Sequence, residues 1–239
     1  MKDFFLNNFS LILFITEAAA AITGLILYKK FKNTKAKYFI WFLVYLTICD
    51  FIGGYKYYIH EDGFLHFLKG TVFETNHWWS TSFWKIGAIL FFAFYYNKIL
   101  ENKEFRNIIK YSGYLFFIFS ISYIIYHWDE FFNRFFPVIS ILGAIVIFLC
   151  TVFYFIEVLQ SAKILTFYRS LNFYINLAIF IWWLIITPIA FYDIYDFTGD
   201  WNFIFLKWQI YLFANIFMYS TFTFALIFCK PEIENEQNI

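Results

Sequence analysis

Four ionisable side chains interrupt the long apolar runs of this sequence, and they are its best candidates for chemistry. Glu17 and Asp50 are acidic, whereas Lys85 and Lys207 are basic. An ionisable group inside a membrane span is energetically expensive, so it is by default a candidate functional residue. Counted from the predicted span ends, all four lie about 8–13 Å below the same membrane boundary. Two acids and two bases at one depth predict a polar pocket in which their charges neutralise each other. This pocket is expected to open to the outer side of the membrane.

Three further residues are expected to line this pocket, namely Gln209, Trp78 and Asp193. Asp50 is expected to face the bundle interior near Lys85 or Lys207. Lys85 is the favoured partner because the second and third spans are neighbours in the sequence. The alternative is that these charges form structural ion pairs, or that the two lysines extend their ammonium groups to the interface. Paired charges would suit a zwitterionic or mixed polar ligand, since no net charge is then buried.

The elements that must position these residues are transmembrane helices. Of the 239 residues, 62% are hydrophobic and 15% are charged, whereas soluble domains have about half and a quarter. Seven apolar stretches are long enough to cross a hydrocarbon core of about 30 Å as helices. They are Phe9–Tyr28, Tyr38–Tyr57, Trp78–Tyr96, Tyr111–Trp128, Pro137–Leu159, Phe173–Tyr192 and Asn202–Cys229. The fold expected is an all-α membrane protein, a bundle of seven transmembrane helices in one domain over residues 1–230.

The basic residues between the spans predict how the bundle is oriented. Twelve of the 18 Lys and Arg fall in loops on one side, and four fall on the other. Since basic loops stay in the cytoplasm, the N-terminus is expected outside and the C-terminus inside. Residues 231–239 are expected to form a short, acidic, disordered cytoplasmic tail. The expected location is a bacterial inner membrane.

Other polar residues of the sixth and seventh spans have a structural explanation. Asn172 and Asn176 mark one helical face, and Tyr211, Asn215 and Tyr219 mark another. Hydrogen bonds between neighbouring helices account for such faces. We therefore expect these residues to serve packing.

No motif typical of an enzyme is present, and neither a cofactor nor a metal is expected. Lys207 invites comparison with microbial rhodopsins, which hold retinal on a lysine of the last helix, but it lies too near the span end. All four His fall in outer loops or at span ends, which disfavours a membrane hydrolase. A net charge of +1 gives no support for nucleic acid as a partner. The partners expected are the lipid bilayer, a small polar ligand, and a membrane or cytoplasmic protein.

Three segments carry a resemblance to known proteins: Gly24–Phe39, Phe153–Leu159 and Asn215–Ser220. They resemble uncharacterised small seven-span membrane proteins of flavobacteria and their relatives. The resemblance implies seven helices and an inner-membrane location over nearly the whole chain. It implies no activity and carries over no catalytic residue.

Three classes of function fit these observations. The favoured class is a receptor-like sensory or signalling module that binds a small ligand in an outward-facing polar pocket. The alternatives are a small transporter or channel, favoured by the intramembrane charges, and a structural or assembly subunit of a larger envelope complex. An enzyme is the least favoured class. The preference for a receptor rests on architecture rather than on site chemistry.

Overall fold

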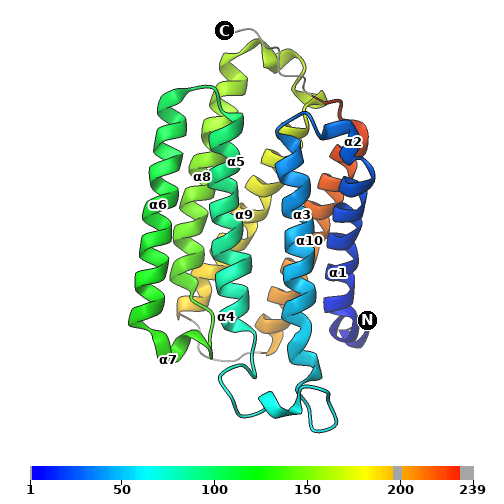
Figure 1. The fold of residues 1–239 in the computed structure, drawn as a ribbon, viewed down its shortest axis with the longest axis vertical. Coiled ribbons are helices and arrows are strands. Elements are labelled where there is room, and N and C mark those ends of the chain that lie inside the picture. Colours follow the sequence, from blue (N-terminus) through cyan, green and yellow to red (C-terminus); the bar gives the residue numbers. More distant parts are fainter. Residues whose placement is uncertain (1, 196–200, 232–239) are drawn as a thin grey trace.

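A computed structural model shows a bundle of long helices that run roughly side by side (Figure 1). It describes residues 2–195 and 201–231, apart from the side chains of residues 2–7, 162–163, 193–195 and 202. The long helices are α1 (Lys2–Ile26), α3 (Ala36–Gly53), α5 (Gly87–Ile99), α6 (Lys103–Tyr126), α8 (Pro137–Gln160), α9 (Leu171–Tyr195) and α10 (Trp201–Phe228). Shorter pieces are α2 (Tyr28–Phe31), α4 (His77–Trp79) and α7 (Trp128–Phe131). Of the expected acidic tail, residues 231–239, all but the first lie outside the described residues.

Six helices are long and apolar enough to cross a membrane, which confirms an all-α, multi-pass membrane bundle. They are Asn8–Ile26, Ala36–Tyr58, Lys103–Tyr126, Pro137–Gln160, Leu171–Tyr192 and Phe203–Phe228. Helices satisfy their own backbone hydrogen bonds, which is the condition for crossing lipid. These six correspond to six of the seven predicted spans.

The remaining predicted span, Trp78–Tyr96, has an unusual backbone. α4 continues without a break into a π-helix, η3 (Ser80–Ile86), and then into α5. A π-helix offsets the ordinary i→i−4 hydrogen bonds and is typical of functional sites. Here the Tyr45 hydroxyl of α3 donates to the carbonyl oxygen of Phe83 at 2.6 Å. The wider turn thus receives part of its hydrogen bonding from a neighbouring helix.

The first and last long helices are neighbours. α1 packs against both α3 and α10, and α9 packs against α8 and α10. α5 packs against α6 and α8. At one end of α1, the Ser10 and Tyr57 hydroxyls are hydrogen bonded at 2.8 Å. Beyond its other end, the Lys30 ammonium donates to the last carbonyls of α10, on Leu226 and Ile227, at 3.2 Å each. α1 is therefore fixed against α3 and α10 at opposite ends of the bundle.

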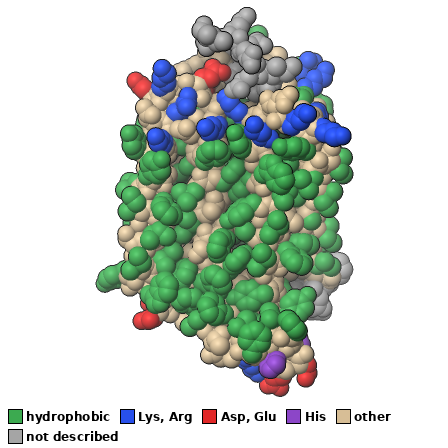
Figure 2. All heavy atoms as spheres, viewed as in Figure 1, with side chains coloured by type: hydrophobic (Ala, Val, Ile, Leu, Met, Phe, Trp, Pro, Cys, Tyr) green, Lys and Arg blue, Asp and Glu red, His purple; other side chains and the backbone are tan. Residues whose placement is uncertain are grey.

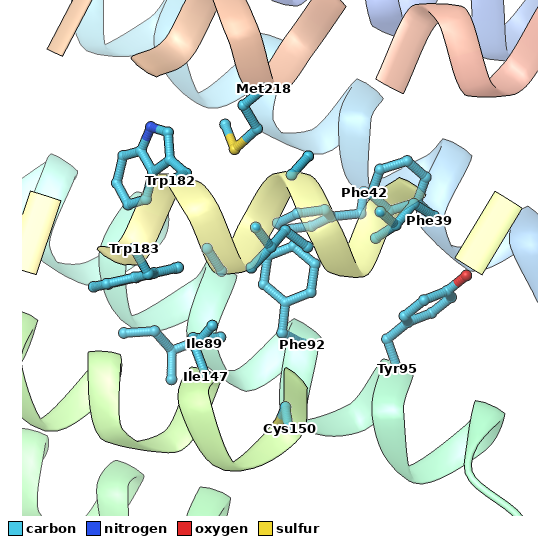
Figure 3. Close-up of a cluster of buried hydrophobic side chains, with 14 of the residues drawn as sticks. Phe39, Phe42, Ile89, Phe92, Tyr95, Ile147, Cys150, Trp182, Trp183 and Met218 are labelled. Atoms are coloured by element: carbon cyan, nitrogen blue, oxygen red, sulfur yellow. The ribbon is translucent and has the colours of Figure 1, made fainter. Parts of the chain in front are cut away.

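Aromatic side chains fill the centre of the bundle. Phe39 and Phe42 of α3, Phe92 and Tyr95 of α5, and Trp182 of α9 are all buried there (Figure 3). Aromatic rings bury large apolar areas, so they contribute strongly to packing. The described core is consequently a packed interior of rings.

Buried hydrogen bonds between helices confirm the structural role expected for the asparagines. They join Tyr95 Oη to Asn172 Oδ1 at 2.6 Å, Tyr96 Oη to Asn176 Oδ1 at 2.5 Å, and Trp182 Nε1 to Asn215 Oδ1 at 3.0 Å. The first two bonds hold α5 to α9, and the third holds α9 to α10. Each bond gives buried polar atoms a hydrogen-bond partner, which lipid tails cannot provide.

The surface divides into a wide apolar band and two polar ends. Lys and Arg gather at one end, near the α1–α3 connection (Figure 2). α1 begins and α10 ends at opposite ends of the bundle (Figure 1). The longest connection, between α3 and α4, lies at the end where α1 begins. It contains a short 3-10 helix, η2 (His66–Leu68).

Small residues set the distance between α5 and α8, which gives a first prediction. A Cβ added at Gly143 would lie 2.0 Å from Ile89 Cδ1, and Ile89 is fully buried. Gly143→Ala should therefore lower the melting temperature of the purified protein, because overpacking costs about 1–3 kcal/mol. Ile89→Val removes that methyl, so the double variant should melt higher than Gly143→Ala alone. Additive losses from the two changes would contradict this packing.

Candidate functional site

Glu17 lies on the face of α1 that packs against its two neighbouring helices, and only 2% of it is exposed. Ala20, Ala21 and Gly24 follow it at i+3, i+4 and i+7, and all three are buried. These positions lie on one helical face. A Cβ at Gly24 would lie 3.1 Å from Ile40 Cγ2. Small residues thus let α3 approach α1 closely beside the glutamate.

The Glu17 carboxyl meets one polar group from each neighbouring helix. It lies beside the Asp50 carboxyl of α3 and the Tyr219 hydroxyl of α10. Within the described part of the chain, Glu17 Oε1 and Tyr219 Oη make no hydrogen bond of ordinary geometry, although the two groups interact with each other. Tyr219 is only 2% exposed. Buried oxygens of this kind, next to a second carboxyl, make this a candidate functional site.

Asp50 connects this site to the molecular surface. The residue is exposed on the outside of α3, and α3 ends three residues later at Gly53. The preceding backbone carbonyl, on Cys49, accepts a hydrogen bond from Trp79 Nε1 at 2.9 Å. The expectation that Asp50 faces the bundle interior stays a prediction, since the residue is exposed on α3 while its carboxyl lies beside the buried Glu17. Its carboxyl lies between the surface and the buried Glu17.

The expected ion pair between Asp50 and Lys85 is wrong. Trp79 and Phe83 both bond to α3, through Cys49 and Tyr45. Lys85 follows Phe83 by two residues, which puts the two on different faces of this π-helical segment. Its side chain therefore points away from α3. Its ammonium donates instead to the Ser140 hydroxyl of α8 at 2.9 Å.

Lys85 belongs to a separate cluster at the beginning of α8. Its ammonium lies 4.8 Å from the centroid of the Phe135 ring, a cation–π contact. The ring of His77, which precedes the predicted span, meets Phe135 edge-on at 4.2 Å. The site reached by Lys85 is thus basic and aromatic.

The other predicted pocket residues are spread over the bundle. Lys207 and Gln209 are half-buried on α10, and no ion pair among the described residues joins Lys207 to Glu17 or Asp50. Trp78 Nε1 donates to the Tyr55 hydroxyl at 3.1 Å. Asp193 is in α9, but its side chain lies outside the described residues. Of the predicted set, the structure brings Glu17 and Asp50 together.

Sequence reasoning missed Tyr219 as a site residue. It was grouped with Tyr211 and Asn215, which share its helical face, and was assigned to packing. Asn215 has such a role, since its amide donates to the Tyr211 carbonyl at 2.8 Å. The spacing of Tyr219 within its helix does not indicate that its hydroxyl faces an acid on α1. The reason is that α1 and α10 lie at opposite ends of the sequence.

Comparisons with protein-family models, with curated proteins and with solved structures found no match to this chain.

A double-mutant cycle tests which partners the charged residues have. Lys85→Met and Asp50→Asn should change the melting temperature additively, because their side chains lie in separate clusters. Lys85→Met and Ser140→Ala should be non-additive, since each removes the same hydrogen bond. Thermal unfolding of the purified variants measures both cycles. Strong coupling between Asp50 and Lys85 would contradict the arrangement described above.

Proposed function

We propose that the chain spans a bacterial inner membrane seven times, with its N-terminus outside and its C-terminus in the cytoplasm. The seventh span is the continuous helical segment His77–Ile99, whose π-helical turn separates two α-helical parts. Support for the orientation comes from the basic residues, which gather at the end where α1 joins α3 (Figure 2). Membrane proteins keep such loops in the cytoplasm.

The function that this geometry supports best is the transport of small cations. The observation that carries it is the Glu17–Asp50 pair, two adjoining carboxyls to which no described basic side chain is ion-paired. Buried negative charge is costly unless a positive partner neutralises it. Acidic residues in this position mark ion and proton pathways in membrane proteins. A cation from solution supplies the missing charge.

The placement of the two acids provides a route as well as a site. Asp50 is exposed on α3 within the apolar span Ala36–Tyr58, and Glu17 lies behind it in the contact between α1, α3 and α10. A cation that reaches this depth of the membrane from outside meets Asp50 first and Glu17 next. Toward the cytoplasm, the aromatic core and the Tyr–Asn hydrogen bonds close the bundle. This arrangement corresponds to a transporter that is accessible from outside.

The receptor role expected from the sequence stays a prediction. Its residue-level support was a pocket lined by Glu17, Asp50, Lys85 and Lys207, and Lys85 bonds elsewhere. The role of assembly subunit has one observation in its favour, which is that Asp50 is exposed on α3. In that case a partner helix would supply the positive charge. Transport remains the better supported function because the buried Glu17 and Tyr219 oxygens face the same site.

Topology is tested with reporters fused after Ile239. A green fluorescent protein there should be fluorescent and an alkaline phosphatase inactive, since the former matures in the cytoplasm and the latter does not. A phosphatase inserted after Asp62, in the connection between α3 and α4, should be active. Phosphatase activity from the C-terminal fusion would overturn the orientation.

Transport is tested in liposomes that contain the purified protein. Steps of pH, Na⁺, K⁺ or methylammonium are applied, and the current is recorded on a supported membrane. We expect at least one of these gradients to drive a current, and Glu17→Gln to reduce it to background because the buried acid is lost. The matched control is Glu61→Gln, which removes an exposed acid bonded to Lys69 and should leave the current unchanged. Absence of both a current and a change of the pH inside the liposomes, followed with a trapped pH dye, with every gradient would contradict transport.

A further inference from the structure

We propose that Lys37 and Lys98 bind the phosphate of an anionic phospholipid, whose acyl chains lie along the seam between α3 and α5. The site is at the end of the bundle where α3 begins and α5 ends. The inference goes beyond transport and uses only the placement of the helices in a membrane. Because it involves neither Glu17 nor Asp50, either idea can fail while the other holds.

Two helices each contribute one ammonium group to the proposed lipid site. Lys37 is the second residue of α3, and Lys98 is the second-last residue of α5. Lys37 Nζ lies 5.2 Å from the centroid of the Tyr38 ring, and Lys98 Nζ lies 5.6 Å from that of Phe94. The two rings meet edge-on, with their centroids 5.4 Å apart. A continuous series of contacts thus joins two positive charges across the seam.

The charges at this site favour a negatively charged ligand. Among the described side chains, no ion pair involves either ammonium. The first turn of α3 contains no acidic residue, although the amino end of a helix attracts negative charge. The carboxyl end of α5 has the opposite partial charge, so the two helix ends roughly cancel. Two formal positive charges remain, and an anion can neutralise them.

The depth of these charges selects a lipid rather than a soluble anion. Lys37 lies in the first turn of the apolar span Ala36–Tyr58. Trp41 follows it at i+4 on the same helical face. Trp41 is 54% exposed and Phe94 is 43% exposed, as is typical of rings at a membrane interface. Lys and Arg side chains follow this edge of the apolar band (Figure 2). Basic residues in such a position attract anionic headgroups.

Aromatic rings give the seam an apolar surface next to the two charges. One turn further into the membrane than the Tyr38–Phe94 contact, Phe42 of α3 and Phe91 of α5 stack with their centroids 3.8 Å apart. Trp41 and Phe94 are exposed beside them. Acyl chains can lie over these rings while the phosphate stays at the lysines. A free phosphate ion would use the charges but not the rings.

Native mass spectrometry of the purified protein in a neutral detergent tests the lipid site. Phosphatidylglycerol and phosphatidylcholine with the same acyl chains are added separately, and the bound lipids are counted. The wild type should bind its first phosphatidylglycerol several-fold more tightly than phosphatidylcholine, whose choline group is positively charged. Lys37→Gln combined with Lys98→Gln should weaken phosphatidylglycerol binding about tenfold. Equal affinity of this variant and the wild type would overturn the proposal.

Lys103→Gln combined with Lys110→Gln is the matched control. It removes the same charge from two exposed positions of α6, near its beginning. Lys110 also lies over a ring, that of Tyr114, at 6.0 Å. The control should bind phosphatidylglycerol like the wild type. An equal loss in the two double variants would mean attraction by total charge alone and would overturn a defined site.

A phosphatidylglycerol with a photoreactive group on its acyl chain locates the lipid in the wild type, so this measurement does not depend on how a variant folds. Cross-links should fall on α3 and α5, near Trp41 and Phe94. Unlabelled phosphatidylglycerol should compete, and inorganic phosphate should not. Cross-links confined to other helices would overturn the site. Competition by inorganic phosphate would overturn the lipid in favour of a soluble anion.

Discussion

A charge inside a membrane must be neutralised, and the position of Glu17 makes this constraint central to the structure. Glu17 is buried where α1 meets α3 and α10, and its neighbours are an acid and a phenol. Lys85 donates a hydrogen bond to Ser140 of α8. The proposed cation transport follows from the two acidic side chains at this site.

Close helix packing creates this situation. Ala20, Ala21 and Gly24 allow α3 to approach α1. The Ser10–Tyr57 and Lys30–α10 hydrogen bonds fix α1 at opposite ends of the bundle. A rigid frame of this kind holds two carboxyls side by side although they repel each other in their ionised forms.

The third predicted span shows how a local backbone feature changes a site. Its π-helical segment, Ser80–Ile86, receives a hydrogen bond from Tyr45, and Trp79 bonds to the Cys49 carbonyl. Both contacts turn this face toward α3, so Lys85 points to α8. Counting residues from the end of the span predicts how deep Lys85 lies in the membrane. It does not predict toward which neighbouring helix the Lys85 side chain points. The direction depends on which face packs against which neighbour.

The sequence by itself determined the all-α membrane class and six of the apolar helices, because hydrophobicity and length decide what can enter lipid. It also identified Glu17 and Asp50, since an acid within an apolar run stands out in any sequence. Only the tertiary structure decided their partners. Tyr219 lies 202 residues after Glu17 in the chain, and no periodicity within one helix reveals a contact with another. Which charges meet depends on the rotation and order of packed helices, and these are properties of the whole bundle.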